Sequence, residues 1–267
     1  MGLCFSSPAA GTGTNACYVD KVSNLPVDSV ISGTGTNSCY IEKLENVELW
    51  NGDYEDPRQV IINTEWGAFG DNSCLDFVRT RYDKEVDENS LNPGNQLFEK
   101  MISGMYMGEL VRRCLVHLTE EGLFFGGQGS QKLYEMYAFK TKYVSMIESD
   151  RKHVFDETRK VLSEMGLEHA TPEDCENLKL VCARFSTRAA FLVSAAVACI
   201  LNRLKRPHTT VGVDGSVYRY HPHFHDLMEK KISELTAPDH KFDLMLSEDG
   251  SGRGAALVAA VAVRTAH

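Results

Sequence analysis

Three glycine-rich turns contain the residue types that bind phosphate groups. They occupy residues 33–37 (GTGTN), 214–216 (DGS) and 250–254 (GSGRG). Backbone N–H groups converge at such turns and at helix N-termini, and without a Cβ an anion can approach them closely. Most glycine-rich turns only reverse the chain, so each turn alone is a weak indication of a phosphate site.

Two glutamates are candidates for binding a sugar. Glu65 follows a predicted strand, and Glu99 lies early in a predicted amphipathic helix. Carboxylate and amide side chains bind sugars because they hold several ring hydroxyls as fixed hydrogen-bond acceptors. Ordinary surface glutamates would show the same spacing, so this pattern alone leaves the function open.

Composition narrows the classes of partner. The net charge of −9 disfavours nucleic acid, whose phosphate backbone an acidic surface repels, whereas a single nucleotide can still be held by backbone amides and a metal ion. The eight cysteines form no CxxC pair and no zinc-type spacing, which indicates reduced thiols in a cytoplasmic protein. The apolar run from Ala189 to Leu201 is too short to cross a bilayer and predicts a buried helix.

The first residues carry a weak signal for lipid attachment. Residues 1–6 (MGLCFS) fit the myristoylation pattern at Gly2, and Cys4 stands where a palmitoyl group could add a second anchor. So short a pattern arises readily by chance, and we expect no membrane attachment.

The elements that would position these residues begin with a repeated segment. Residues 11–25 (GTGTNACYVDKVSNL) and 33–47 (GTGTNSCYIEKLENV) are identical at nine of fifteen positions. Two copies are too few for a solenoid, which needs at least three units to bury a core. A duplicated segment of which one copy is used, such as two versions of one exon joined in tandem, is the simpler interpretation.

An α/β order of elements follows the second copy. The GTGTN turn and the alternating run at 39–44 predict a hairpin, and strands are predicted at 59–64, 209–213 and 242–246. Helices are predicted from about 91 to 118 and at 156–165, 184–204, 223–235 and 255–263, with Thr171 and Pro172 marking a further helix start. This alternation is typical of an α/β protein.

Five runs of sequence resemble the hexokinases, in the order of that family. They are residues 63–71 (NTEWGAFGD), 90–100 (SLNPGNQLFEK), 105–112 (MYMGELVR), 211–218 (VGVDGSVY) and 247–256 (SEDGSGRGAA). The resemblance implies the larger, C-terminal lobe of a sugar kinase, with an actin-like, ribonuclease-H-like α/β fold in which helices flank a mixed sheet. We therefore expect an irregular segment at residues 1–32 and a hexokinase large domain at 33–267.

The resemblance also implies roles for individual residues. Asn37, Glu65 and Glu99 match hexose ligands of the family. The positions that match its ATP-binding segments are Thr34, Gly35, Gly104, Met105, Thr141, Ser145, Gly215, Ser216 and Tyr220. Asn37 lies 28 residues before Glu65 and Asn15 lies 50 before it, and the shorter separation is in register with the family. The implied reaction transfers the γ-phosphoryl group of ATP to the 6-hydroxyl of a hexose such as glucose, the entry step of glycolysis.

No metal site of the protein's own is expected. His221, His223 and His225 form an HxHxH pattern, but the family often has His-Pro before the helix that follows, so we interpret these histidines as structural or surface residues. Mg²⁺ is expected to be carried by the nucleotide.

Two motifs of the family are missing from the sequence. One is a D-x-G-G-T-N phosphate motif, and the other is an N-D-T-V-G run whose aspartate takes the proton from the sugar's 6-hydroxyl. Asp20 and Asp28 precede Gly33 but have different neighbours. The resemblance therefore implies that no catalytic base is present.

Loss of a general base alone costs about 10²–10⁴ in rate, and phosphoryl transfer also depends on closure of the cleft. We therefore predict negligible phosphorylation by this chain alone. Three hypotheses remain. The chain is a fragment or mis-assembled form of an active hexokinase, or it binds sugar or nucleotide without turnover, or a partner chain supplies the base.

Overall fold

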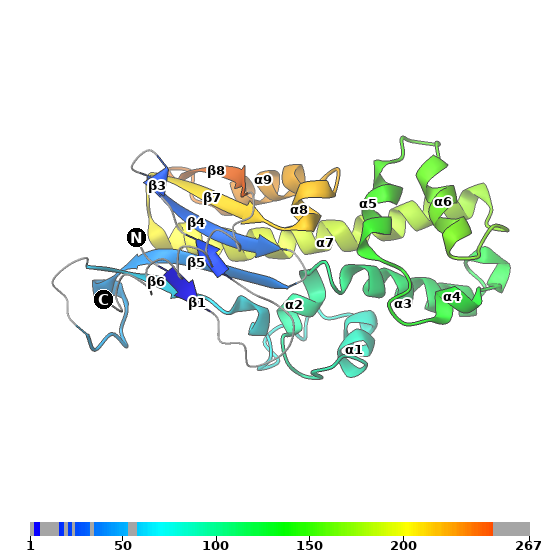
Figure 1. Cartoon of the computed structure of the whole chain (residues 1–267), viewed down its shortest axis with the longest axis horizontal. Coiled ribbons are helices and arrows are strands. Elements are labelled where there is room, and N and C mark those ends of the chain that lie inside the picture. The colour runs from blue at the N-terminus through cyan, green and yellow to red at the C-terminus, as the bar shows by residue number, and fades with distance from the viewer. Residues whose placement is uncertain are drawn as a thin grey trace, which may run out of the picture.

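The computed structural model describes residues 3–5, 16–18, 21–22, 25–32, 35–52 and 58–247. Its centre is a six-stranded mixed sheet in which β6, β5, β4, β7 and β8 lie in that order and β3 pairs with β4 (Figure 1). These strands are β3 (Lys21–Val22), β4 (Leu25–Ser32), β5 (Thr36–Lys43), β6 (Gln59–Asn63), β7 (His208–Asp214) and β8 (Lys241–Leu246). Strands β4, β7 and β8 are parallel, whereas β5 and β6 are antiparallel to their neighbours. Two short strands, β1 (Leu3–Phe5) and β2 (Ala16–Tyr18), pair with each other.

The predicted hairpin is present, and its first strand precedes the boundary placed at residue 33. Strand β4 pairs with β5 on one side and with β7 on the other, so it is a central strand of the main sheet. The segment predicted to be irregular therefore contributes residues 25–32 to the sheet. The predicted domain boundary followed the start of the GTGTN turn at residue 33. A hairpin needs a strand before its turn as well as after it, so the domain begins earlier, with β4.

Nine α-helices are described, together with three short 3₁₀ turns. The α-helices are α1 (Arg81–Glu88), α2 (Leu97–Ile102), α3 (Met107–Glu120), α4 (Gln131–Tyr134), α5 (Thr141–Ser149), α6 (Asp156–Glu164), α7 (Pro172–Leu204), α8 (Ser216–Tyr220) and α9 (Phe224–Leu235). The 3₁₀ turns are η1 (Leu44–Asn46), η2 (Trp66–Ala68) and η3 (Phe125–Gly127).

Helix α7, with 33 residues, connects the helical part of the molecule with the sheet. It runs from the helical region formed by α3, α5 and α6 to the sheet, where it packs beside α9 (Figure 1). Thr171 and Asp174 form a capping box at its start, with Pro172 at the first helical position, as the sequence predicts. The helix predicted at 184–204 is the C-terminal part of α7, which begins twelve residues earlier. By length and composition α7 could cross a membrane, but half of its most apolar window is buried inside the fold, where Val193 and Val197 belong to the core.

Several predicted elements are confirmed to within two residues, and one is wrong. The strands β6, β7 and β8 and the helices α6 and α9 lie where the sequence places them. The single helix predicted from about 91 to 118 is instead two helices, α2 and α3, because Ser103 is extended (φ −77°, ψ 156°). The glycine-rich turn at 250–254 and the helix predicted at 255–263 lie outside the described residues.

Candidate functional site

The predicted site residues gather where strands β4 and β7 end. In the register of the sheet, Ile31 of β4 is paired with Asn37 of β5 on one side and with Asp214 of β7 on the other. Neighbouring strands are about 4.8 Å apart, so Asn37 and Asp214 are separated by about 10 Å of sheet. The carboxyl ends of parallel strands are where open α/β sheets bind ligands. The hairpin and the β7 turn therefore share one edge of the sheet.

A chain of hydrogen bonds connects Asn37 to Glu65. The Asn37 Nδ2 group donates to Asn63 Oδ1 (2.6 Å), and Asn63 Nδ2 donates to Glu65 Oε1 (2.5 Å). Ser38 N and Thr64 Oγ1 both donate to Asn37 Oδ1 (2.8 and 3.1 Å). Asn37 is buried and Glu65 is exposed, so the chain leads from the hairpin out to solvent. Asn63, which the sequence analysis did not single out, is its middle member.

Glu99 faces the same hairpin from helix α2. Its Oε2 atom accepts a hydrogen bond from Thr36 N (2.9 Å), and Thr36 Oγ1 accepts one from Trp66 Nε1 (2.9 Å). Burial raises the pKa of the Glu99 carboxyl above its usual value, and the nearby Glu65 carboxylate raises it further, whereas the Thr36 N–H and the Lys100 ammonium oppose the rise. Glu65 and Glu99 are thus close enough to interact electrostatically.

Left-handed backbone conformations help to fix the positions of the Glu65 and Glu99 carboxylates. Glu65 (φ 49°, ψ 37°) lies between β6 and η2 as the N-cap of η2, and Gln96 (φ 58°, ψ 42°) is the N-cap of α2. Such conformations are uncommon for residues other than glycine and cost about 1 kcal/mol or more each, so surrounding contacts must hold them. Asp71 supplies two such contacts, because its carboxylate accepts hydrogen bonds from Gln96 N (3.0 Å) and Leu97 N (2.9 Å). This cap fixes the start of the helix that carries Glu99.

Gly35 lies against the carboxylate of Glu99. A Cβ at this position would be 2.7 Å from Glu99 Oε2, which is closer than real contacts allow. The Gly35→Ala chain is therefore expected to fold normally while the Glu99 carboxylate swings away from its position. An off-rotamer side chain costs about 0.5–1.5 kcal/mol, and the upper end of this range corresponds to a loss of about tenfold in affinity for any ligand of Glu99.

The measurement for Gly35→Ala is a pair of calorimetric titrations, one with glucose and one with a non-hydrolysable ATP analogue. A tenfold loss for glucose with unchanged analogue affinity is the expected result. An unchanged glucose affinity would contradict the positional role of Gly35.

A second group of predicted residues lines one cavity of ≈390 Å³. Its lining consists of Gly104, Thr141, Lys142, Ser145, Met146, Ser149, Ser216, Val217 and Tyr220. Five of these were named as ATP-binding positions: Gly104, Thr141, Ser145, Ser216 and Tyr220. The other four, Lys142, Met146, Ser149 and Val217, were not named individually. Lys142 and Val217 are next to named positions, and Met146 and Ser149 follow Lys142 and Ser145 by one helical turn. The cavity lies between α5 on one side and α8 on the other.

The remaining predicted ATP-binding residues are placed differently. Met105 is partly exposed next to Gly104, and Gly35 lies beside Glu99 rather than in the cavity. Gly215 has φ 132° and ψ 151° at the start of α8, a conformation that only glycine adopts readily, so it makes the turn from β7 into the cavity wall. Thr34 lies outside the described residues.

The hydroxyl of the cavity residue Thr141 joins α5 to the segment between α2 and α3. Thr141 Oγ1 donates to Gly104 O (2.6 Å) and accepts from Gly108 N (2.9 Å). A Cβ on Gly108 would collide with the backbone from Phe139 to Thr141. The glycine therefore allows the start of α3 to lie directly against the start of α5. The break between α2 and α3 therefore brings Gly104 to the N-terminus of α5. Hydroxyl groups, backbone N–H groups and the Lys142 ammonium are the groups that could contact phosphates here.

The described residues contain no group of three or more His, Cys, Asp or Glu side chains that could hold a metal ion. The HxHxH pattern does not converge on one point, because His221 pairs with Glu148 and His225 with Tyr218.

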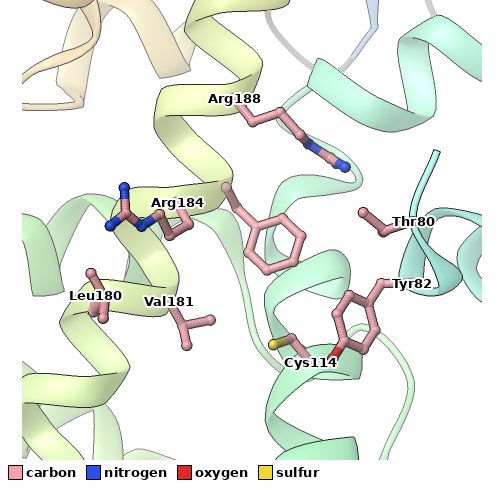
Figure 2. A pocket seen from close by; sticks show the side chains of 8 residues that line it. Thr80, Tyr82, Cys114, Leu180, Val181, Arg184 and Arg188 are labelled. Atoms are coloured by element: carbon pink, nitrogen blue, oxygen red, sulfur yellow. The ribbon is translucent and has the colours of Figure 1, made fainter. Parts of the chain in front are cut away.

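An apolar cavity of ≈350 Å³ lies elsewhere, between α1, α3 and α7. Figure 2 shows its lining, which is formed by Thr80, Tyr82, Cys114, Leu180, Val181, Arg184, Phe185 and Arg188. Arg188 is paired with Asp83 (2.7 Å), and burial raises the pKa of the Cys114 thiol, so the thiolate needed for nucleophilic chemistry is disfavoured. None of the predicted site residues lines this cavity.

Comparison with known proteins places these features in context. The hexokinase family profile matches residues 27–261. Hexokinase HKDC1 of Mus musculus is 49% identical over 261 residues, covering 96% of this chain and 26% of that protein. Hexokinase-1 of Homo sapiens is 48% identical over 260 residues, covering 95% and 25%.

Among solved structures, the hexokinase from Schistosoma mansoni complexed with glucose superposes with a TM-score of 0.82 at 43% identity. The superposition covers 87% of this chain and 52% of that one. The chain thus spans about a quarter of the length of the curated relatives and about half of the solved chain.

Proposed function

The chain belongs to the hexokinase family, and from this premise we propose that it binds glucose at Glu65 and Glu99 and ATP in the cavity between α5 and α8. The fold is the α/β, actin-like fold of sugar kinases, with helices flanking a mixed sheet. The proposed reaction of the whole enzyme is transfer of the ATP γ-phosphoryl group to the 6-hydroxyl of the hexose.

The observation that carries this proposal is that both glutamates are held at the same hairpin, Glu99 by Thr36 N and Glu65 by Asn63, which bonds to Asn37. Two carboxylates held by Thr36 N and Asn63 are fixed acceptors for sugar hydroxyl groups, and charge-assisted hydrogen bonds are about twice as strong as neutral ones. Trp66 and Phe98, which adjoin these glutamates in sequence, are buried and in edge-to-face contact (6.2 Å between ring centroids).

Helix α2 connects the two proposed sites. Glu99 lies in its first turn, and Gly104, two residues beyond its last residue, lines the nucleotide cavity. A sugar at Glu99 and a nucleotide beside Gly104 would therefore be neighbours, as phosphoryl transfer requires. Mg²⁺ would arrive with the nucleotide and neutralise phosphate charge, while Lys142 and the hydroxyls of Ser145 and Ser216 would hold the phosphates and ribose.

The test of this proposal is calorimetric titration of the purified chain with glucose and with Mg·AMPPNP. Saturable binding of both ligands is expected, with glucose binding weakened about 100-fold when Glu99 is replaced with alanine. Absence of binding for both ligands would refute the proposal.

A second candidate function is binding without turnover, by a sugar- or nucleotide-holding module. It is favoured by the absence from the sequence of the D-x-G-G-T-N and N-D-T-V-G motifs. Supply of the base by a partner chain is the third possibility, and a coupled glucose-6-phosphate assay with and without that partner distinguishes it from the second. An upstream reading frame that contains both motifs would identify the chain as part of an active hexokinase.

We also propose a cytoplasmic location without a nucleic-acid or membrane partner. Support comes from the net charge of −9 and from the six described cysteines, Cys39, Cys74, Cys114, Cys175, Cys182 and Cys199, all of which are free thiols.

A further inference from the structure

A buried histidine–glutamate pair connects the two walls of the nucleotide cavity. His221 Nε2 lies 3.1 Å from Glu148 Oε1, and both side chains are almost completely buried (1% and 4% exposed). Glu148 belongs to α5 and adjoins the cavity residue Ser149, whereas His221 follows the cavity residue Tyr220 at the end of α8. The contact spans 73 residues of sequence.

The second ring nitrogen of His221 fixes the direction of this hydrogen bond. His223 N donates to His221 Nδ1 (3.2 Å), so Nδ1 is an acceptor and carries no proton. The ring proton is therefore on Nε2, which donates to the Glu148 carboxylate. The edge of the Phe224 ring packs against His221 (6.0 Å between centroids), so the imidazole is held by packing as well as by its hydrogen bonds.

Helix α8 depends on contacts of this kind for its position. It has only five residues, too few for an isolated helix to be stable, and only Val217 and Tyr218 among them are buried. Three cavity residues, Ser216, Val217 and Tyr220, belong to this helix. Their positions therefore depend on the contacts that hold α8 against the rest of the fold. His221, at the C-cap of α8, is the anchor that reaches across to α5.

We propose that His221 and Glu148 are positioning residues for the nucleotide, because their buried hydrogen bond sets the spacing between α5 and α8 across the cavity. This inference rests on the proposed nucleotide site. Glu148 and His221 themselves do not line the cavity, so they act through Ser149 and Tyr220.

The test uses two substitutions at His221 that separate its two hydrogen bonds. His221→Asn keeps an acceptor near the position of Nδ1 but cannot reach Glu148, whereas His221→Gln places a donor near the position of Nε2. The affinity of the full chain for Mg·AMPPNP is expected to fall about tenfold in His221→Asn, the effect of one hydrogen bond, and about twofold or less in His221→Gln. Glucose affinity, measured by the fluorescence of Trp66 beside Thr36, is expected to stay unchanged in both.

Two further variants complete the design. His225→Asn is the matched control, because His225 Nδ1 bonds to Tyr218 (2.6 Å) on the same segment without reaching α5, and it should leave nucleotide affinity unchanged. Glu148→Ala tests the bond from the other helix if His221→Asn does not fold, and it too should lose about tenfold in Mg·AMPPNP affinity. Unchanged nucleotide affinity in folded His221→Asn or Glu148→Ala, or equal losses for glucose and nucleotide, would overturn the inference. If the unaltered chain binds no nucleotide, the proposed function fails and this inference fails with it.

Discussion

Replacing Glu99 with alanine is expected to weaken glucose binding by about 100-fold. A hydrogen bond to a charged group contributes about 1.5–3 kcal/mol, and a bound sugar would lose this acceptor completely. The hydrogen bond that Thr36 N donates to Glu99 in the free chain would also be lost. Isothermal titration with glucose gives the affinity directly.

The matched control for this variant is Glu99→Gln, which keeps an oxygen acceptor for Thr36 N but removes the charge. We expect an intermediate loss of glucose affinity and unchanged binding of the ATP analogue in both variants. Glucose affinity within about twofold of the unaltered chain in Glu99→Ala would exclude Glu99 as a sugar ligand.

Glucose affinity is also expected to fall on acidification at a higher pH than an ordinary glutamate would require. The folded-state pKa of Glu99 is raised above its usual 4.5, chiefly by burial, so its carboxylate is protonated as the pH falls through that raised value. Above the raised pKa, ionisation of Glu99 lowers the free energy of unfolding. This destabilisation disappears as the pH falls to the usual pKa of 4.5, because the carboxyl group is then protonated in the folded chain. Glu99→Gln should accordingly melt at a temperature equal to or above that of the unaltered chain at pH 7, with the difference vanishing near pH 4. A glucose affinity that stays constant on acidification until the usual pKa is reached would contradict this prediction.

The second large effect concerns turnover. The purified chain is expected to phosphorylate glucose at least about 10²–10⁴ times more slowly than a full-length hexokinase at saturating glucose and Mg·ATP, because positioned proton transfer alone contributes a factor of this size. The sequence contains neither motif from which the family draws its base and its first phosphate contact. A coupled assay for glucose-6-phosphate measures the rate.

Residual turnover needs a control against traces of host hexokinase in the preparation. The Glu99→Ala variant, purified in the same way, serves this purpose, since turnover by the chain itself must fall with the loss of Glu99. Rates comparable to those of a full-length enzyme that also disappear in Glu99→Ala would show that another residue of this chain supplies the base.

The sequence predicted much of the fold because its signals were local. Thr171, Pro172 and Asp174 identify the start of α7 from the chemistry of a helix N-terminus alone. The β-branched run of β7 and its DGS turn likewise predicted a strand and its end. The gathering of Glu65 and Glu99 is a long-range feature, which no periodicity could show, and only the resemblance to a family indicated it.

The features that were missed depend on tertiary contacts. The break at Ser103 is stabilised by hydrogen bonds between Thr141 and the Gly104–Gly108 segment, which lie far apart in sequence. Strand β4 was predicted to be part of an irregular segment because it lies between the two copies of the repeat, and its pairing with β7 is a long-range contact. Asn63 was overlooked as a site residue because its role appears only through its contacts with Asn37 and Glu65.

The short helix α2 has a consequence for the energetics of the two proposed sites. Glu99 lies in its first turn and Gly104 just past its end. If this six-residue helix moves as a rigid body, Glu99 in the sugar site and Gly104 in the nucleotide site move with it. A ligand that displaces this helix at one end therefore changes the free energy of binding at the other. Thermodynamic linkage makes that cooperativity reciprocal, so whatever factor the sugar imposes on nucleotide affinity, the nucleotide must impose on sugar affinity.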